Sequence, residues 1–510
     1  MNKPNSVNEE LIHNGIEHVS VNGKSDIHVQ SDRGLGGTHP QQRLFQQVYD
    51  LLLEKLAGRE WGEHEKLPSV RTLAAKLGVH RLTVLKAYQL LRETGHVYVK
   101  EKSGYYVLPE KQREDHTSTN VGNYLPESGD CWPVRLHSFS QALVDPALLP
   151  NRYFSEYAKK VFDLYPKVLS TYSSVQGDEE LRSVLCRLFA KTHQLHLTAD
   201  DLLITTGAQQ AIDLIARAFV QRGDVVLIER PTYHAAITIF EGYGARLVPV
   251  DISPDGYDLV QLEKLMRQHQ PRMFYINPTF HNPTGYTVPV RQRKLLAELA
   301  ERYHCLIAED DSFRDIYFNE APPPPVASYD TDGWVLYIRS FSKYAAPGLR
   351  VAAVCAQPPR MNLLLQYKYQ MDNGAPLLNQ KVFLLYLASE RLTGHLEKLR
   401  IALELRKVAM EETLREAGWT WESPDGGLSL WVQLPEGGVS AEILLERCAQ
   451  HGVSFSPGIA HDPLREMRSY IRLSYSFVNE AEIKTGMRRL IESANPSHSP
   501  QAAVVIERRV

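Results

Sequence analysis

The sequence predicts an α/β protein with a small N-terminal helix-turn-helix unit, a β-hairpin, and a large domain built on a mostly parallel sheet. Two observations lead to this fold class. Residues 66–107 contain two short helical patterns, a tight turn between them and a hairpin pattern. From about Trp132, short apolar segments such as "DLLITTG", "DVVLIERP" and "HCLIAEDD" alternate with helical patterns, which is typical of a parallel sheet covered on both faces.

Changes in composition divide the chain into five predicted segments. Residues 1–40 are polar and aperiodic, and we expect a flexible lead. The helix-turn-helix unit covers 41–107, and the charged, Ser-, Thr-, Gly- and Pro-containing stretch 108–131 is predicted to be a linker. The large domain covers 132–494, and 495–510 form a flexible tail.

The bulk composition narrows the class of protein. A formal net charge of −3 excludes a global attraction to nucleic acid or membrane, so any such site must be local. No apolar run reaches membrane-spanning length, and the start "MNKPNSVNEE" has no apolar signal core. The five cysteines have no metal-type spacing, which favours reduced thiols, no metal site and a cytoplasmic protein.

The N-terminal unit has the pattern of a winged helix-turn-helix. An amphipathic helix in "QRLFQQVYDLLLEKLAG" precedes it. Ser69 is the predicted cap of the next helix and Gly78 its end. A second short helix runs from about Arg81 to Thr94, and the hairpin turns around Ser103-Gly104. In this motif the second helix enters the major groove of DNA.

Local charge supports contact with DNA. The segment from Lys66 to Lys102 contains eight Lys and Arg residues and only two Glu residues, although the whole chain is slightly acidic. A basic run is usually a solvated face. On a helix-turn-helix with a basic wing, however, it indicates a phosphate-binding surface, because phosphate contacts supply most of the affinity for DNA.

The segments "LPSVRTLAAKLGV" and "TVLKAYQLL" resemble the GntR family of bacterial regulators. The resemblance implies that Arg71 and Arg81 reach the DNA, with Thr83 on the same helix face, and that Lys102 and Gly104 belong to the wing. One residue departs from the family pattern. His80 stands where a Ser or Thr usually caps the helix, so we expect either a frayed helix start or an imidazole that contacts phosphate.

Two segments of the large domain have the features of a phosphate site. In "ITTGAQQAI", Gly207 permits a strand-to-helix turn, after which the amides of Ala208 and Gln209 are available to an anion. "SFSKYAAPGLR" adds the Ser340 hydroxyl and the Arg350 guanidinium beside Lys343. A single strand-Gly-helix junction is more often only structural.

Four further side chains fit pyridoxal 5′-phosphate. Lys343 supplies an amine for the aldehyde, and Asp310, at the end of an apolar strand, supplies a carboxylate for the ring nitrogen. Tyr233 offers an aromatic partner for the ring, and Asn282 a donor for its phenolate oxygen. Taken singly, such an Asp is often solvated and an Asn-Pro pair is often a turn, so the order of the whole set carries the prediction.

"NPTG" and "SFSKYAAPGLR" resemble the fold-type I aminotransferases, and the similarity extends from about Trp132 to Glu492. It implies that Lys343 forms the internal aldimine. It also implies that Tyr172 reaches the cofactor phosphate of a neighbouring subunit and that Arg472 binds a substrate α-carboxylate. A surface arginine at a strand edge is the alternative for Arg472. Two positions depart from the family, namely Phe313 in place of a Tyr and Ala352 in place of a Gly.

The combination resembles the MocR subfamily of GntR regulators. That resemblance implies a head-to-tail homodimer that binds double-stranded operator DNA and senses an amino compound, or the cofactor itself, through the Lys343 aldimine. An active aminotransferase that carries a DNA-binding module is the alternative. A metabolic aminotransferase with a decayed N-terminal domain is disfavoured by the retained helix periodicity and basic charge.

Overall fold

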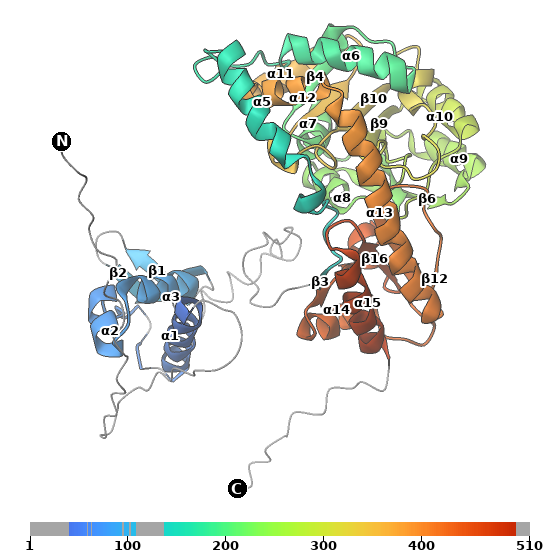
Figure 1. The fold of residues 1–510 in the computed structure, drawn as a ribbon. Helices are drawn as coiled ribbons and strands as arrows, with labels where there is room; N and C mark the ends of the chain where they lie inside the picture. The colour runs from blue at the N-terminus through green and yellow to red at the C-terminus, as the bar shows by residue number, and fades with distance from the viewer. Residues whose placement is uncertain are drawn as a thin grey trace, which may run out of the picture. The chain divides into compact units, whose positions relative to one another are not determined.

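The computed structural model describes residues 40–58, 60–62, 64–93, 96–100, 104–108 and 137–495 (Figure 1). The chain forms two compact units, Met1–Ser128 and Gly129–Val510. The predicted lead up to residue 39, the linker from residue 109 to 131 and the tail from residue 496 lie outside the described residues.

The first unit is the predicted winged helix-turn-helix. Its elements are α1 (Pro40–Ala57), α2 (Val70–Leu77), α3 (Arg81–Glu93) and the antiparallel strands β1 (Val97–Lys100) and β2 (Gly104–Val107). Apolar side chains from the helices and the hairpin form one core, which includes Val48, Leu52, Leu56, Leu73, Val84, Ala87, Tyr88, Leu91, Val97 and Val107.

Capping residues set the ends of α2 as the sequence predicts. The Ser69 hydroxyl accepts a hydrogen bond from the Thr72 amide at 3.1 Å. Gly78 ends the helix in the left-handed conformation, with φ of 64°. The Tyr88 hydroxyl then donates to the Pro68 carbonyl at 2.8 Å, which ties α3 to the segment before α2.

The second unit is built on an eight-stranded sheet in the order β4-β11-β10-β9-β8-β5-β6-β7. The five strands from β10 to β6 are parallel, while β11 runs antiparallel to both of its neighbours and β7 antiparallel to β6. This confirms the predicted mostly parallel sheet. In sheet order the strands are Leu202–Thr205, Ala352–Cys355, Val335–Ser340, Leu306–Asp311, Met273–Ile276, Val225–Arg230, Arg246–Ser253 and Gly256–Tyr257.

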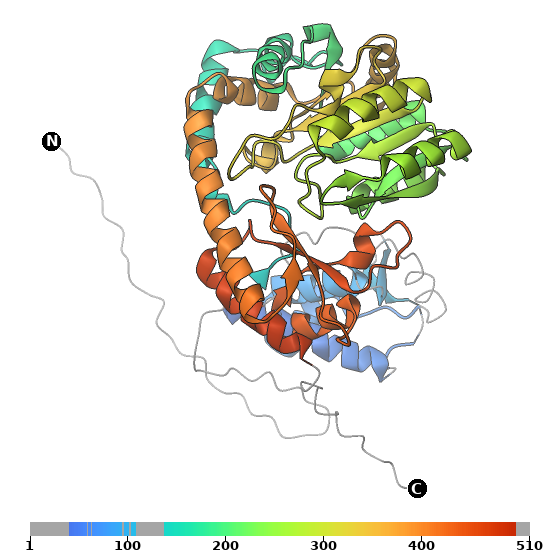
Figure 2. The same ribbon diagram turned by 90° about the vertical axis from the view of Figure 1, so that its right-hand side faces the viewer.

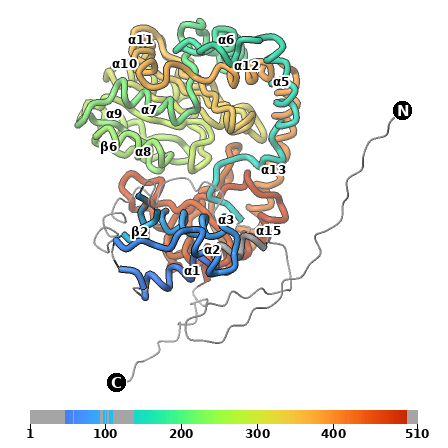
Figure 3. The backbone as a smooth tube through the Cα atoms, turned by 90° about the vertical axis from the view of Figure 1, so that its left-hand side faces the viewer, coloured from blue at the N-terminus to red at the C-terminus, as the bar shows by residue number. Residues whose placement is uncertain are grey.

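Helices cover both faces of this sheet (Figure 2). Alternate residues of β5 show the two layers, because Val226 and Ile228 lie in one apolar cluster and Leu227 lies in the other. α5 and α12 pack against each other and α12 also packs against α6 (Figure 3). The helices are α5 (Asn151–Leu164), α6 (Glu179–His193), α7 (Ala208–Phe219), α8 (His234–Gly242), α9 (Leu259–His269), α10 (Val290–Arg302), α11 (Arg360–Asp372) and α12 (Leu377–Leu387).

The long helix α13 (Arg391–Glu416) leads from the main sheet to a small antiparallel sheet (Figure 2). That sheet contains β12 (Thr420–Trp421), β13 (Ser429–Gln433), β16 (Tyr470–Ser474) and β15 (Ser456–Pro457), and α14 (Ala441–Gln450) and α15 (Glu480–Ala494) belong to the same part. β3 (His137–Ser138) pairs with β14 (Val453–Ser454), so the start of this unit joins its last elements.

Five short 3₁₀ helices complete the elements, at Pro146–Leu148, Ala199–Asp201, Val326–Tyr329, Pro347–Leu349 and Gly458–His461. Among the residues that the structure describes, no helix has both the length and the apolar character that crossing a membrane requires.

Candidate cofactor and ligand site

The predicted site residues follow the carboxyl ends of neighbouring strands of the main sheet. Asp310 lies at the end of β9 and Ser340 at the end of β10, and Asp310 is in register with Ile338. Gly207 follows β4, and Asn282 lies in the loop after β8. Because parallel strands end at the same edge of a sheet, segments far apart in the sequence converge there.

Lys343 presents its amine in this place. Its Nζ donates to the carbonyl of Ala142 at 2.9 Å. Burial, assisted by the Arg472 guanidinium and opposed by Asp310, lowers the pKa of Lys343 to about 8. The amine is therefore far more often unprotonated at neutral pH than an ordinary lysine, as a nucleophile toward an aldehyde must be.

Asp310 is a buried carboxyl group with two hydroxyl donors. It is 4% exposed and accepts hydrogen bonds from Ser312 Oγ at 2.6 Å and Tyr275 Oη at 3.0 Å. Burial outweighs these two donors and raises the pKa of Asp310 to about 6. Neither donor was predicted from the sequence, although Ser312 follows the quoted segment "HCLIAEDD" directly and its position two residues after Asp310 was an available signal.

Asn282 and Arg472 form a buried pair. The Oδ1 of Asn282 accepts from Arg472 Nη1 at 2.9 Å, and Arg472 Nη2 donates to the carbonyl of Ser140 at 2.6 Å. Arg472 is 4% exposed and lies on β16, between β13 and β15, so the surface-arginine alternative is wrong. Burial lowers the pKa of Arg472 to about 10, which leaves it cationic at neutral pH.

Asn277 is a further residue that the sequence did not single out. Its side-chain oxygen accepts from the Asn282 amide at 2.6 Å, and its side-chain nitrogen donates to the Asp310 carbonyl. Its own amide donates to Glu229 Oε2 at 2.7 Å. Asn277 thus links two of the predicted cofactor residues.

The predicted phosphate residues form an anion cradle. Gly207 has φ of 99°, and a Cβ at this position would lie 2.4 Å from Arg350 Nη2, so only glycine lets the guanidinium lie against this turn. No side chain caps α7, which begins at Ala208 and continues with Gln209. Helix-terminal amides beside a guanidinium favour a phosphate, and the buried Ser340 ends β10, which β11 separates from β4 in the sheet.

The remaining predicted residues occupy different environments. Tyr233 is partly buried at the start of α8, and burial raises the pKa of its phenol. Tyr172 is 86% exposed, and its contact with a neighbouring subunit stays a prediction. Phe313 is buried among apolar side chains, so it adds no polar atom to the site. Ala352 is buried in the sheet between Thr205 and Ser340.

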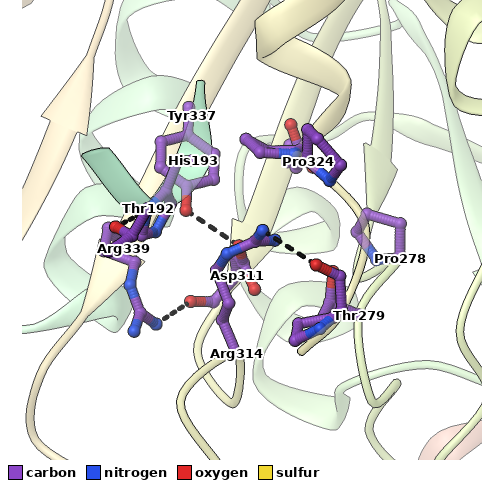
Figure 4. Close-up of polar contacts among 12 residues, drawn as sticks. Thr192, His193, Pro278, Thr279, Asp311, Arg314, Pro324, Tyr337 and Arg339 are labelled. Carbon is purple, nitrogen blue, oxygen red and sulfur yellow. Dashed lines mark hydrogen bonds and ion pairs between the residues drawn. The ribbon is translucent and has the colours of Figure 1, made fainter. Parts of the chain in front are cut away.

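Buried charged side chains surround Asp311, the residue that follows Asp310 on β9 (Figure 4). The Oδ2 of Asp311 accepts from Tyr337 Oη at 2.8 Å and from Arg314 Nη1 at 3.4 Å. Arg339 Nη1 donates to the Asp311 carbonyl at 2.6 Å. These contacts hold the end of β9 in place, and they depend on tertiary packing that no local sequence pattern encodes.

The predicted DNA-contacting residues lie in the first unit. Arg71, His80 and Arg81 are exposed, and Gly104 begins β2. Thr83 is only 7% exposed, which corrects the expectation that it shares an exposed face with Arg81. Lys102 lies outside the described residues.

His80 does cap α3. Its Nδ1 accepts a hydrogen bond from the Leu82 amide at 3.3 Å, and its carbonyl accepts from the Thr83 amide at 2.9 Å. The helix begins directly after it, at Arg81, so the expected fraying of the helix start is not found. Whether the imidazole also contacts phosphate stays a prediction.

A lysine of lowered pKa, a buried carboxyl group, an anion cradle and a buried arginine fit pyridoxal 5′-phosphate, and together with this sheet they define a fold-type I pyridoxal phosphate protein. The model of the family "Aminotransferase class I and II" matches residues 153–490, and the chain belongs to this family. Residues 44–107 match "Bacterial regulatory proteins, gntR family". The chain therefore has the two-part architecture of the MocR type.

Known proteins resemble the large unit alone or nearly the whole chain. The 2-aminoadipate transaminase of Thermus thermophilus is 34% identical over 69% of this chain and 88% of its own length. The HTH-type transcriptional regulator YdfD of Bacillus subtilis is 29% identical over 88% of this chain and 95% of its own length. The crystal structure of LysN, an α-aminoadipate aminotransferase from Thermus thermophilus, is 33% identical with a TM-score of 0.66, over 70% of this chain and 92% of its own.

Proposed function

We propose that the protein is a pyridoxal phosphate-dependent transcription regulator, in which the winged helix binds operator DNA and a ligand of the large unit changes the DNA affinity. The observation that carries this proposal is that one chain combines a helix-turn-helix unit whose Arg71 and Arg81 are exposed with a large unit in which candidate cofactor residues are joined by hydrogen bonds. Similarity over 88% of the chain to a protein named as a regulator supports it.

The surface chemistry of the first unit supports DNA binding. Arg81 is the first residue of α3 and Arg71 lies in the first turn of α2, and both are exposed. In helix-turn-helix proteins the N-terminal residues of the second helix contact base edges. We therefore assign Arg81 to base or phosphate contact and exclude the buried Thr83 from the contact set.

The second unit supports an amino compound with a carboxylate as the ligand. Pyridoxal phosphate, when bound, supplies an aldehyde that reacts with amines and a ring that withdraws electrons. Lys343 would hold the cofactor through its amine, and the buried carboxyl group of Asp310 would pair with the ring nitrogen. Arg472, held by Asn282, has the guanidinium geometry that binds a carboxylate bidentately.

An active aminotransferase is the second candidate. The lowered pKa of Lys343 favours it. Once an amino acid had replaced this amine on the cofactor, the free amine would often be unprotonated near neutral pH and could accept a proton from that amino acid. The 34% identity to a named transaminase supports it as well. Rapid multiple-turnover transamination, with DNA affinity indifferent to every ligand, would favour this candidate.

We further propose a cytoplasmic, head-to-tail homodimer that presents two winged helices to paired half-sites. Tyr172 is 86% exposed, and apolar side chains near it in sequence are also exposed, among them Leu164 at 62% and Leu169 at 72%. An exposed apolar surface of this kind favours burial against another subunit. Light scattering should give twice the chain mass of 57.9 kDa, and a monomer would contradict the proposal.

A paired titration tests the regulator. The full chain with its cofactor is titrated with candidate amino acids while the visible spectrum and the affinity for the promoter fragment beside its gene are followed together. We expect at least one amino acid to change both. Lys343→Ala is the matched control, since it should abolish the response to the ligand and leave the winged helix intact.

A further inference from the structure

One loop of the large unit contacts both groups that the proposed function assigns to ligand and cofactor. Arg472 Nη2 donates to the Ser140 carbonyl at 2.6 Å, and Lys343 Nζ donates to the Ala142 carbonyl at 2.9 Å. The two carbonyls are two residues apart, and we name residues 140–143 the site loop. Main-chain oxygens thus accept hydrogen bonds from the guanidinium that a ligand carboxylate requires and from the amine that a cofactor aldehyde requires.

Both ends of the site loop are anchored. Phe139 is fully buried, and its carbonyl accepts from the Ser474 amide at 2.8 Å. On the other side, the Asp145 amide donates to the Ser476 carbonyl at 2.8 Å. The Ser140 hydroxyl lies 3.2 Å from that of Ser138, next to the first anchor. A movement of the loop is therefore confined to the residues between two fixed points.

The middle of the site loop has few other contacts. Within the described part of the chain, the backbone amides of residues 140–143 donate no hydrogen bond. Leu143 is 36% exposed, and its carbonyl accepts from Ser476 Oγ at 2.6 Å. The carbonyls of the loop accept hydrogen bonds from Arg472, Lys343 and Ser476, of which the first two belong to the ligand site, and the Ser140 hydroxyl also lies 3.2 Å from that of Ser454.

We propose that the site loop is a built-in competitor of the ligand: a ligand carboxylate displaces the Ser140 carbonyl from Arg472, and the loop leaves the site. This inference rests on the proposed binding of an amino compound at Lys343 and Arg472. A carboxylate carries a full negative charge and offers two oxygens to the guanidinium, whereas the Ser140 carbonyl is neutral and offers one. In a buried site this difference favours the ligand.

The position of the site loop in the sequence connects ligand binding with the predicted linker to the winged helix. The loop directly follows β3, which is the first described element after the predicted linker. Release of the loop therefore takes place close in sequence to the predicted linker, directly after the anchor at Phe139. A ligand that binds only when the loop is released has a different affinity for the two loop states, as a ligand that shifts an equilibrium must have.

Thiol accessibility measures the release. Ala142→Cys in the full chain with bound cofactor places a reporter in the loop, and iodoacetamide labelling at position 142 is compared with that of the half-buried Cys186 by peptide mapping. L-Alanine should speed labelling at position 142 roughly tenfold, the factor expected for loss of one hydrogen bond to a charged group. Ethylamine, which has the amine but no carboxylate, should not.

The outcomes separate this inference from the proposed function. A visible spectrum that responds to L-alanine, with unchanged labelling at position 142, overturns the competitor role and leaves the ligand site in place. A spectrum that responds to neither probe counts against L-alanine as a ligand of the proposed site. In that event Arg472→Ala tests the competitor role without a ligand. This variant should speed labelling at position 142, and an unchanged labelling rate would overturn the competitor role.

A second variant loosens the loop without touching Arg472 or Lys343. Ser476→Ala removes the hydrogen bond to the Leu143 carbonyl, so labelling at position 142 should rise and L-alanine should bind more tightly, because its competitor is weakened. Ser493→Ala is the control, a buried serine whose hydroxyl donates to the Arg489 carbonyl at 2.7 Å, and it should change neither. Faster labelling with weaker or unchanged L-alanine binding in Ser476→Ala would show ordinary destabilisation and overturn the inference.

Discussion

Arg472 donates a hydrogen bond of 2.9 Å to the side-chain oxygen of Asn282, which joins the predicted ligand-carboxylate site to the predicted cofactor site. Both side chains are at least nine-tenths buried. A substitution of either residue should therefore change the hydrogen bonding and position of the other side chain, even though the two are far apart in the sequence.

Asn282→Asp should weaken the binding of ligands that carry a carboxylate. The introduced carboxylate pairs with Arg472 in a buried place and competes with the ligand for the guanidinium, so we expect a loss of roughly tenfold or more in ligand affinity. Titration of the visible spectrum with L-alanine measures the affinity. Asn282→Ser, which adds no charge, is the control, and an equal loss in both variants would contradict the competition.

The pH dependence of cofactor attachment should report Lys343. Only the unprotonated amine attacks the aldehyde, and the folded pKa lies at about 8 instead of the ordinary 10.5. The rate of attachment to the cofactor-free protein should therefore rise as the pH rises toward about 8 and level off above it. Stopped-flow absorbance measures the rate, and borohydride reduction with peptide mapping should place the label on Lys343. A rate still rising steeply at pH 10, or a label on another lysine, would contradict the assignment.

Asp310→Asn should stabilise the cofactor-free protein while impairing its response to amines. The folded pKa of Asp310 is raised from 3.8 to about 6, so folding costs free energy once the carboxyl group is ionised in the unfolded chain. This cost is absent below about pH 4, grows as the pH rises to about 6, and is at most about 3 kcal/mol above that. Thermal unfolding at pH 8 and at pH 4 should show the advantage of Asp310→Asn only at the higher pH. An equal melting temperature at pH 8 would contradict the raised pKa.

Arg81→Ala should weaken operator binding without unfolding the first unit. Arg81 is exposed at the start of α3, and loss of one contact to a base edge costs about 1–3 kcal/mol. Arg92→Ala, at the other end of the same helix, is the control and should cost less. Fluorescence anisotropy with the promoter fragment measures both affinities, and circular dichroism checks the fold. Equal losses would contradict the orientation in which the start of α3 meets the DNA.

Much of the fold followed from local patterns. The strand segments of the main sheet are apolar and short, and the winged helix shows its caps at Ser69 and Gly78, so periodicity and turn residues were sufficient. The candidate cofactor residues could be proposed because motifs such as "NPTG" are contiguous in the sequence. Arg472 was singled out by the resemblance alone, and its burial depends on the position of β16 between two other strands.

Contacts between distant segments were not predictable in this way. Tyr275 and Asn277 reach Asp310 only because β8 lies beside β9. The carbonyls of the site loop carry no side-chain signal at all. Thr83 is different, because it lies four residues before the buried Ala87 and the helical period could have placed it on the buried face.

The most direct test of the regulator is the response of DNA affinity to a carboxylate ligand in the native protein and in Arg472→Ala, measured in the same cuvette as the visible spectrum. We predict that an amino acid which changes the spectrum of the native protein also changes its affinity for the promoter fragment. We predict that Arg472→Ala keeps the cofactor and binds DNA but loses this response. A native protein whose spectrum changes while its DNA affinity stays constant, or an Arg472→Ala protein that responds like the native one, would contradict the account.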